Sequence, residues 1–267
     1  MTIKRAILIA AGRGKRLGPH TEEVPKCMVQ VGTQPILSWV WRALAAVGVE
    51  ELIVIRGYRG DVLESFVRSL VPRVTFVDNT EWQTNNVLLS MMCARRYFDQ
   101  PTYVTYSDII FTPAVARAAA SSSAEIGLVI DRDFRSIYQG RTEHPLDEGE
   151  VSDLLPDGSV ARVGKKALPP AEAIGEYIGL ARLGARGVAA VANTLDQLAH
   201  RFAGKEHEPF QRAATYRNAY QTDLWQTMID GGIRIDPVLV DGQWREIDTG
   251  QDLDRARQLV ESSKDWS

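Results

Sequence analysis

Residues 10–18 read AAGRGKRLG and follow directly on a short apolar run at residues 6–9. A run of this kind is typical of a strand buried on both faces of a sheet. In an open α/β sheet, the loop after such a strand lies at the carboxyl edge, where ligands bind. Its glycines let the backbone approach a phosphate closely, and Arg16 can contact a phosphate through two N–H groups. The stretch therefore predicts a phosphate-binding loop after the first strand.

Two well-known phosphate-binding loops do not fit this stretch. The P-loop requires the pattern G-x-x-x-x-G-K-[ST], which does not occur in the chain. The dinucleotide fingerprint requires G-x-G-x-x-G at the start of a helix and an acidic residue at the end of the second strand. Here Gly18 comes one residue late, Pro19 and Pro25 prevent an immediate long helix, and the second apolar run ends in Arg56-Gly57. Hydride transfer with a dinucleotide is therefore disfavoured.

The first half of the chain alternates short apolar runs with amphipathic segments. The runs predict strands at 6–9, 52–55, 74–77, 103–106 and 126–130, and the segments predict helices at 35–47, 61–70, 86–98 and 113–120. This alternation indicates an α/β fold with a mostly parallel sheet and helices on both sides. After residue 131 the pattern predicts a hairpin at 151–163, a strand at 177–183, helices at 188–202 and 218–229, a strand at 238–240 and a last helix at 252–260.

The composition indicates an ordinary globular protein. The chain has 267 residues, 45% of them hydrophobic, and a formal net charge of −3. Basic residues are mixed with acidic ones, so a nucleic-acid partner is not expected. The apolar runs are too short for a membrane span of roughly 20 residues or for a signal peptide, so we expect a cytoplasmic protein without membrane contact. The spacing of Cys27 and Cys93 fits neither a zinc site nor a disulfide framework.

The string A-A-G-x-G-x-R-L at residues 10–17 continues with Pro19, Thr21 and Pro25-Lys26. It resembles the signature of the nucleotidyltransferase family that includes sugar-1-phosphate nucleotidylyltransferases and choline-phosphate cytidylyltransferases of bacterial type. The order of elements and several later motifs also agree, so the resemblance covers nearly the whole chain. It implies a three-layer α/β/α, Rossmann-like nucleotidyltransferase with an inserted acceptor-binding lobe.

The resemblance implies an enzyme that couples a nucleoside triphosphate to a small acceptor and releases pyrophosphate. The acceptor oxygen attacks the α-phosphorus in line, so the protein contributes positioning and charge neutralisation, with Mg²⁺ as cofactor. By similarity, residues 12–16 hold the triphosphate, and the catalytic candidates are Lys26, Arg16 and Asp108. We expect one domain, divided into a nucleotide-binding part at 1–131, an acceptor-binding lobe at 132–240, and a last part at 241–267 that carries a metal aspartate and the C-terminal helix.

Asp108 and Asp248 are the predicted magnesium ligands. Asp108 follows the strand predicted at 103–106, level with the glycine loop. Thr112-Pro113 already marks the start of the next helix, which frees Asp108 from capping it. Asp248 matches the second metal ligand of the family by position. From the residues alone, Asp248 or Thr249 could equally begin the C-terminal helix.

The segment Thr84-Asn85-Asn86-x-x-x-Ser90 opens the helix predicted at 86–98. An amide at this edge can read a base through its paired donor and acceptor, and capping of the helix is the alternative role for one of the two asparagines. The segment looks more like the cytidylyltransferase branch of the family than the sugar branch, which favours CTP. The predicted nucleotide-binding residues are Ala10, Ala11, Gly12, Arg13, Gly14, Lys15, Arg16, Asn85, Asn86 and Ser90.

The second half of the chain supplies the predicted acceptor contacts. Lys165 matches, by similarity, a lysine that contacts the acceptor phosphate, and a cationic acceptor could be held by carboxylates and by an aromatic wall through cation–π attraction. The aromatic residues could equally belong to the core. In the polar stretch 140–145, Arg141 and His144 could instead bind an anionic acceptor, although a single histidine there is more often a surface loop residue than a catalyst. The predicted acceptor-binding residues are Lys165, Glu176, Asp223, Tyr220, Trp225, Trp244 and Arg141.

These observations favour a cytidylyltransferase that couples CTP to a small phosphorylated or phosphonate acceptor, such as phosphocholine or an aminoalkylphosphonate, and gives a CDP-linked product. A sugar-1-phosphate uridylyl- or thymidylyltransferase is the nearest alternative. A catalytically silent nucleotide-sensing subunit is disfavoured, because it would be expected to lose Lys26 or a metal carboxylate. The expected partners are small molecules, and the sequence leaves the acceptor and the oligomeric state open.

Overall fold

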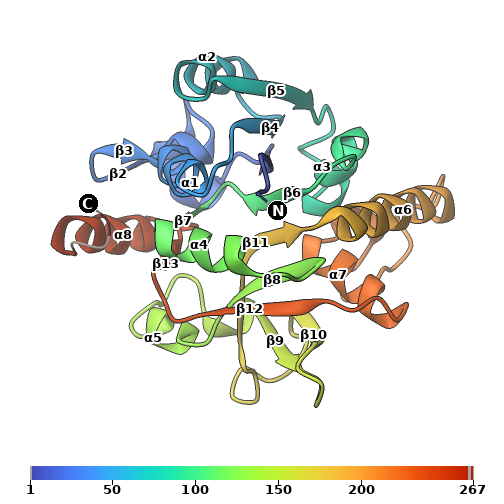
Figure 1. Cartoon of the computed structure of the whole chain (residues 1–267). Helices are drawn as coiled ribbons and strands as arrows, with labels where there is room; N and C mark the ends of the chain where they lie inside the picture. Colours follow the sequence, from blue (N-terminus) through green and yellow to red (C-terminus); the bar gives the residue numbers. More distant parts are fainter. Residues whose placement is uncertain (1, 264–265, 267) are drawn as a thin grey trace.

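The first strand, β1 (Arg5–Ala10), lies inside a sheet of nine strands in the computed structural model, which describes residues 2–263 and 266 (Figure 1). Its parallel neighbours are β4 (Glu51–Arg56) and β6 (Thr102–Tyr106), and β5 (Arg73–Asp78) continues the parallel part beyond β4. All six residues of β1 are buried, as the apolar run predicts for a strand with both faces covered. The glycine loop therefore leaves the sheet at its carboxyl edge.

The second half of the chain extends this sheet beyond β6. Strand β11 (Gly175–Leu183) runs antiparallel to β6, and β8 (Ile126–Asp131) runs antiparallel to β11. Strand β12 (Asp236–Val240) pairs in parallel with β8, and the hairpin of β9 (Glu150–Leu154) and β10 (Val160–Lys165) joins β11 through β9. Four strands of the predicted acceptor-binding lobe, β9, β10, β11 and β12, thus belong to the nine-stranded sheet.

Helices cover both faces of the sheet. Because side chains alternate along a strand, Ala6 and Leu8 of β1 contribute to one core, and Ile7 and Ile9 contribute to the other. The first core is closed by α1 (Ile36–Ala45), α2 (Gly60–Leu70) and α4 (Pro113–Ser121), and the second by α3 (Val87–Cys93), α6 (Ala185–Arg201) and α7 (Gln221–Asp230). The expected three-layer α/β/α fold is confirmed.

Short elements around the carboxyl edge were not anticipated. A two-stranded ladder joins β7 (Ile109–Phe111) to β13 (Trp244–Glu246), and the small hairpin of β2 (Gln30–Val31) and β3 (Gln34–Pro35) precedes α1. The polar stretch 132–150 contains the short helix α5 (Phe134–Tyr138). Single 3₁₀ turns occupy Lys15–Thr21, Lys26–Met28, Arg95–Tyr97, Leu146–Glu148 and Tyr216–Asn218.

Two predicted helices are shorter than the sequence pattern indicates. The helix expected at 86–98 ends at Cys93 and continues only as the 3₁₀ turn Arg95–Tyr97, and the helix expected at 218–229 begins at Gln221. The last helix, α8 (Gly250–Ser262), is closed at its start by a capping box, in which Thr249 Oγ1 accepts from the backbone N–H of Asp252. Thr249 therefore caps α8, and the Asp248 side chain does not.

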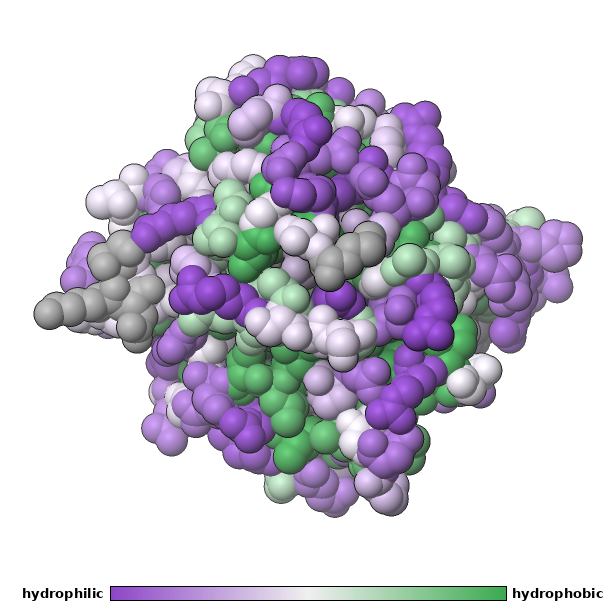
Figure 2. All heavy atoms as spheres, in the orientation of Figure 1, coloured by the Kyte–Doolittle hydropathy of each residue, from purple (hydrophilic) through white to green (hydrophobic). Residues whose placement is uncertain are grey.

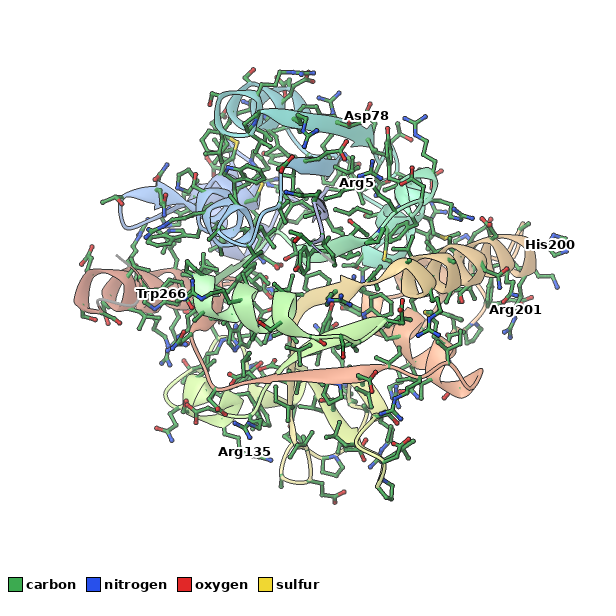
Figure 3. All side chains as sticks on the ribbon, viewed as in Figure 1. Arg5, Asp78, Arg135, His200, Arg201 and Trp266 are labelled. Atoms are coloured by element: carbon green, nitrogen blue, oxygen red, sulfur yellow. The ribbon has the colours of Figure 1, made fainter. Side chains whose placement is uncertain are left out.

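The ends of the described chain are held by side-chain contacts (Figure 3). Arg5, at the start of β1, donates to Glu51 Oε2 at 2.7 Å, and Trp266 packs edge-on against Trp39 of α1 with ring centroids 5.8 Å apart. Polar side chains cover most of the face shown in Figure 2, and an apolar area lies over its lower half near the edge strand β12, where Leu239 is 39% exposed. Within residues 2–263 and 266, no helix is long and apolar enough to cross a membrane.

Candidate active site

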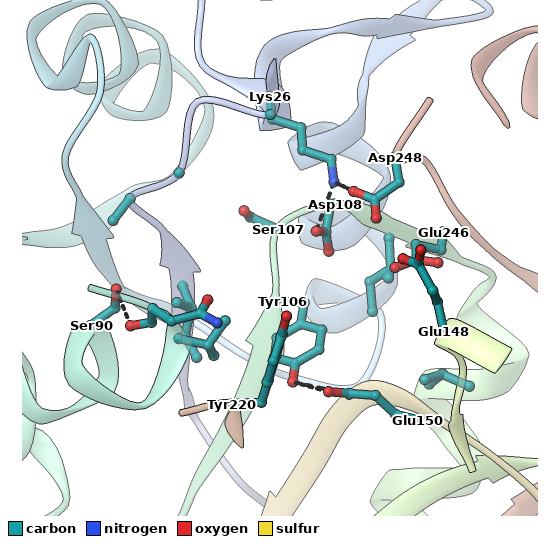
Figure 4. Close-up of a pocket in the computed structure, with 18 of the residues that line it drawn as sticks. Lys26, Ser90, Tyr106, Ser107, Asp108, Glu148, Glu150, Tyr220, Glu246 and Asp248 are labelled. Atoms are coloured by element: carbon teal, nitrogen blue, oxygen red, sulfur yellow. Dashed lines mark hydrogen bonds and ion pairs between the residues drawn. The ribbon is translucent and has the colours of Figure 1, made fainter. Parts of the chain in front are cut away.

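A pocket of about 300 Å³ opens at the carboxyl edge of the sheet, beside the glycine loop (Figure 4). Its wall combines the loop after β1, the start of α3, the ends of β6 and β10, and the strand β13. Residues far apart in the sequence therefore meet in one place. Of the residues predicted from the sequence, the pocket is lined by Ala11, Gly12, Gly14, Arg16, Lys26, Asn85, Asn86, Ser90, Asp108, Lys165, Glu176, Tyr220, Trp244 and Asp248.

Lys26 lies between the two predicted metal aspartates. Its Nζ donates to Asp108 Oδ2 at 2.9 Å and also to Asp248 Oδ1, and the lysine is only 7% exposed. The aspartates meet because β13 pairs with β7, and the backbone N–H of Ile247 donates to the carbonyl of Asp108 at 2.8 Å. The sequence separates these two aspartates by most of the chain, and this ladder brings them together.

In this cluster, attraction between opposite charges affects the pKa values of Lys26 and Asp248 more than burial does. Burial favours the neutral form of Lys26, but Asp108 and Asp248 raise the pKa of its ammonium above the ordinary value. Burial likewise raises the pKa of Asp248, but Lys26, His144 and Arg16 outweigh it and hold that pKa well below the usual range. Lys26 is thus an ammonium and Asp248 a carboxylate at neutral pH.

The backbone of the glycine loop leaves room for Lys26. Gly14 has φ +74°, and a Cβ at this position would lie 2.8 Å from Cδ of Lys26. Its carbonyl accepts from the backbone N–H of Leu17 at 3.0 Å and from Thr21 Oγ1 at 3.2 Å, which closes the 3₁₀ turn. Glycine is therefore required at position 14 both by the backbone conformation and by the path of the lysine.

Arg16 reaches across the pocket mouth. Its guanidinium donates to Asp248 Oδ2 and, at 3.3 Å, to Glu148 Oε2. The side chain is 48% exposed, so it can turn toward a ligand without disturbing the core. Burial lowers and the nearby carboxylates raise the pKa of Arg16, with a net rise, so the group stays charged.

The predicted base-reading residues form an amide network that includes Asn79, which the sequence analysis missed. Asn79 exchanges hydrogen bonds with Asn85 at 2.8 and 3.0 Å and donates to Ser90 Oγ at 2.8 Å. Asn86 Nδ2 donates to the carbonyl of Asn218 at 2.9 Å. Neither asparagine caps α3 with its side chain, so the capping alternative is wrong. Asn79 directly follows the strand at 73–78, and that position at the carboxyl edge was the available signal.

Carboxylates form one end of the pocket, and only Glu176 among them was predicted. Glu150 accepts from Tyr106 Oη at 3.1 Å and from Thr222 Oγ1 at 3.1 Å, and burial raises its pKa to about 7. Glu176 accepts from Tyr138 Oη at 2.7 Å, while its Oε2 is buried without a partner. Burial and the charge of Glu246 raise the pKa of Glu176 to about 8.

The aromatic wall is smaller than predicted. Tyr220 lines the pocket, and Lys165 Nζ lies 4.7 Å from the centroid of its ring. Trp244 also lines the pocket, with its indole N–H donating to Asp131 Oδ2 at 2.7 Å. Trp225 is fully buried in the core and does not line the pocket, so its predicted acceptor contact is corrected to a packing role.

Other predicted site residues also lie outside the pocket lining. Asp223 accepts from the backbone N–H of Tyr220 at 2.8 Å and completes the capping box of α7, and Arg141 pairs with Asp252 at 2.7 Å. Arg13 stacks over the ring of Tyr58 at 5.4 Å. Asp223 and Arg141 are already engaged by the protein, so their predicted ligand contacts are corrected to structural ones, whereas the Nε of Arg13 is buried without a hydrogen-bond partner and its nucleotide contact stays a prediction. Ala10 is buried at the end of β1 and Lys15 is exposed; neither lines the pocket.

His144 is not the surface loop residue that the sequence suggested. It is 1% exposed and lies beside Glu246 and Asp248, with Nδ1 3.6 Å from Glu246 Oε2 and 3.3 Å from Asp248 Oδ2. Glu246 was missed as well. Since residues two apart on a strand share a face, the spacing of Glu246 and Asp248 was the signal that could have found it.

The carboxylates around Lys26 fit a hard divalent cation. Asp108 Oδ1 is buried without a partner, and its other oxygen and Asp248 Oδ1 already share the ammonium of Lys26. Mg²⁺ prefers oxygen ligands and is usually held by one or two carboxylates together with substrate phosphates. Asp108 and Asp248 supply this donor set at the mouth of the glycine loop.

The fold and this pocket together define a class of protein that handles nucleoside triphosphates. A glycine loop at the carboxyl edge of the sheet, a buried lysine and two aspartates from distant segments converge on one space. Residues 6–157 match the family described as the MobA-like NTP transferase domain. The chain belongs to this family and is a nucleotidyltransferase.

Individual relatives agree with this assignment. The CTP:phosphoglutamine cytidylyltransferase of Campylobacter jejuni is 27% identical over 255 residues, which cover 93% of this chain and 97% of the relative. The 2-aminoethylphosphonate cytidylyltransferase of Lancefieldella rimae is 29% identical over 161 residues, 60% of each chain. The solved structure of the inositol-1-phosphate CTP transferase from T. maritima shares the fold, with a TM-score of 0.72 over 98% of both chains at 18% identity.

Proposed function

We propose that this nucleotidyltransferase couples CTP to a small acceptor that carries both a phosphate or phosphonate and an ammonium group, releasing pyrophosphate and joining CMP to the acceptor's phosphate (a CDP-linked product) or phosphonate. The observation that carries the proposal is that cationic side chains lie beside the glycine loop while buried carboxyl groups lie at the other end of the same pocket. Lys26 and Arg16 face the glycine loop, and Glu150 lies at the other end beside Tyr106 and Tyr220 (Figure 4). A zwitterionic acceptor matches this distribution of charge.

The residues near the loop position the triphosphate. Backbone N–H groups of residues 12–16 face the phosphates, Arg16 turns from Asp248 to contact them, and the ammonium of Lys26 offsets the charge that develops at the α-phosphorus. The acceptor oxygen attacks the α-phosphorus in line, and pyrophosphate leaves on the opposite side. Mg²⁺ held by Asp108 and Asp248 would neutralise the reacting phosphates.

Cytosine is the base best supported. The two relatives compared by sequence are named as cytidylyltransferases, and the pocket is lined beside the glycine loop by Asn85 and Ser90, which are hydrogen-bonded to the buried Asn79. Amide groups offer a donor and an acceptor together, which is the pattern needed to read the edge of a cytosine. The base would lie against the start of α3.

The acceptor end supports an ammonium group. Glu176 is 3% exposed, and its unpartnered Oε2 is an acceptor that has no hydrogen bond within the protein. Tyr220 adds an aromatic face near the same end, and Lys165 is placed above that ring to contact the acceptor phosphate or phosphonate. The acceptors in the names of the two relatives, phosphoglutamine and 2-aminoethylphosphonate, each carry an amino group on a phosphorus compound.

Pyrophosphate release tests the proposal directly. We would measure release for CTP, UTP, dTTP and ATP against phosphocholine, 2-aminoethylphosphonate, ethylphosphonate and glucose 1-phosphate, with Mg²⁺ and with a chelator. We expect release with CTP and a cationic acceptor, and at least about tenfold lower kcat/KM for ethylphosphonate, which lacks the ammonium but is otherwise the same. Release with UTP and glucose 1-phosphate but not with CTP would overturn the assignment.

Two variants test the assignment of residues. Lys26→Ala and Asp108→Asn should each lose most turnover while remaining folded at the assay temperature. Lys15→Ala is the matched control, because Lys15 belongs to the same loop but is exposed and does not line the pocket. Near-normal activity in either of the first two variants would place the phosphate and metal contacts elsewhere.

A further inference from the structure

The side chains of His144, Glu246 and Asp248 form a cluster beside the site described above, and this nucleotidyl-transfer scheme gives His144 no role. One ligand atom from each residue lies within 4.8 Å of the others. His144 is 1% exposed, and its Nδ1 points at the two carboxylates without making a hydrogen bond. A buried imidazole nitrogen that faces two carboxylates without a hydrogen bond calls for an explanation, and a bound cation between them is one.

The surroundings hold the imidazole in this orientation. Its ring packs edge-on against Tyr138 at 6.3 Å, and Nε2 lies 3.7 Å from Glu148 Oε2. The segment before it is fixed to the start of α8, because Arg141 donates to both oxygens of Asp252 at 2.7 and 3.1 Å. Packing and the Arg141–Asp252 ion pair therefore aim the nitrogen at the carboxylates, and Arg141 also donates to Glu246 Oε2 at 2.9 Å.

The two oxygens of Asp248 face different neighbours. Oδ1 accepts from Lys26, on the side of Asp108, whereas Oδ2 lies 3.3 Å from His144 Nδ1. Oδ2 also accepts from Arg16, but that side chain is half exposed and is needed at the triphosphate. Asp248 can therefore bridge two cations, one on each oxygen.

We propose that His144, Glu246 and Asp248 bind a second divalent cation, distinct from the one expected at Asp108. Two atoms that bind one ion at the roughly 2.0–2.2 Å typical of imidazole nitrogen and carboxylate oxygen lie at most about 4.4 Å apart, and His144 Nδ1 is 3.3 Å from Asp248 Oδ2 and 3.6 Å from Glu246 Oε2. An imidazole nitrogen favours transition-metal ions such as Zn²⁺ or Fe²⁺, whereas an all-oxygen set suits Mg²⁺; Mn²⁺, which suits oxygen ligands, also accepts an imidazole and can report on this site. The enzyme would thus hold two chemically different cations on either side of Asp248.

The test uses the full chain, stripped with a chelator and titrated with Mn²⁺ alone. Pulsed electron paramagnetic resonance detects a nitrogen bonded directly to Mn²⁺, and incorporation of ¹⁵N-histidine must change that signal in the wild-type protein. We expect a nitrogen-coordinated ion in the wild type. Absence of the nitrogen signal, or absence of Mn²⁺ binding, overturns the proposal without the need for any variant.

Variants then show whether the nitrogen bound to Mn²⁺ belongs to His144. His144→Gln should remove the signal and weaken Mn²⁺ binding by about tenfold or more, whereas Glu246→Gln should weaken binding and keep the signal. His200→Gln is the matched control, because His200 is exposed on α6, away from the pocket (Figure 3). An unchanged nitrogen signal in folded His144→Gln assigns the metal elsewhere and leaves His144 as a residue that only positions Asp248.

The result of this experiment does not depend on whether the proposed function is correct. It contains no nucleotide and no acceptor, so a wrong choice of CTP or of acceptor would leave the nitrogen signal intact. Conversely, a protein that releases pyrophosphate from CTP but binds Mn²⁺ without nitrogen keeps the proposed function and loses only the second site.

Discussion

Lys26→Met removes one charge from a cluster of three while keeping most of the side-chain volume. The lysine ammonium is shared by Asp108 and Asp248, and breaking a buried ion pair by removing one partner typically costs 3–5 kcal/mol. The lower end applies here, because the Asp108 side chain is 28% exposed and can recover some hydration. We therefore expect a loss of about 3 kcal/mol, or about 6–12 °C in melting temperature for a chain of this size.

The dependence on pH follows from the sign of the Asp248 shift. Since its pKa is held below the unfolded value of 3.8, Asp248 contributes stability above that pH, and the contribution is lost as the pH falls through the folded value. The variant lacks this contribution. The difference in melting temperature between wild type and Lys26→Met should be full at pH 7 and should narrow below about pH 4.

Thermal unfolding in a chelator, between pH 3.5 and pH 8, checks this prediction. Mg²⁺ or Mn²⁺ should stabilise Lys26→Met more than the wild type, because the variant has no ammonium between the carboxylates. Lys15→Met serves as the control and should melt like the wild type. Melting temperatures of wild type and Lys26→Met that agree within about 1 °C at pH 7 would refute the coupling of Lys26 to the two aspartates.

Three further predictions follow from the pocket and the core. With the pKa of Glu176 raised to about 8, roughly one tenth of this carboxyl is ionised at pH 7. In steady-state kinetics, KM for a cationic acceptor should therefore fall several-fold from pH 7 to pH 9, and the KM of Glu176→Gln should not change with pH in this way. Gly14→Ala places a Cβ against Lys26 at φ +74°, so kcat/KM should fall more than about tenfold and the melting temperature should fall. A Cβ at Gly12 would meet no atom within 4 Å, so Gly12→Ala should keep the wild-type melting temperature, and equal melting temperatures of the two variants would contradict this prediction. Trp225→Ala should cost about 3–5 kcal/mol in urea unfolding, and a change confined to acceptor KM would instead restore its predicted ligand role.

The strands and the glycine loop could be predicted from the sequence because their signals come from residues that are close together in the chain. The buried runs and the glycine loop depend on side-chain periodicity and backbone freedom within a few residues, so β1 and the position of Gly14 could be anticipated. The late start of α7 could not, because tertiary contacts hold the segment before this helix in a non-helical path. The backbone N–H groups of Asn86 and Leu88, for example, donate to carbonyls of Arg217 and Ala219 in the segment before α7.

The missed acidic residues show the limit of the same reasoning. Glu150 and Glu246 have no motif of their own, and an isolated glutamate in a sequence is usually a solvated surface residue. They enter the pocket because β9 pairs with β11, and β13 pairs with β7. Pairing between strands far apart in the chain is not encoded in any local pattern, so the charge of the acceptor end was visible only in the assembled sheet.

The predicted aromatic wall illustrates the opposite error. Tyr220 and Trp225 are separated by five positions around the start of one helix, and their residue types suit a cationic ligand equally well. The two residues lie in different surroundings. Tyr220 precedes α7 and lines the pocket, whereas Trp225 lies within the helix and belongs to the core. Which aromatic residue can contact a ligand therefore depends less on how many the segment contains than on which side of one capping box each residue lies, and the carboxylates beside Tyr220 in the pocket come from other strands.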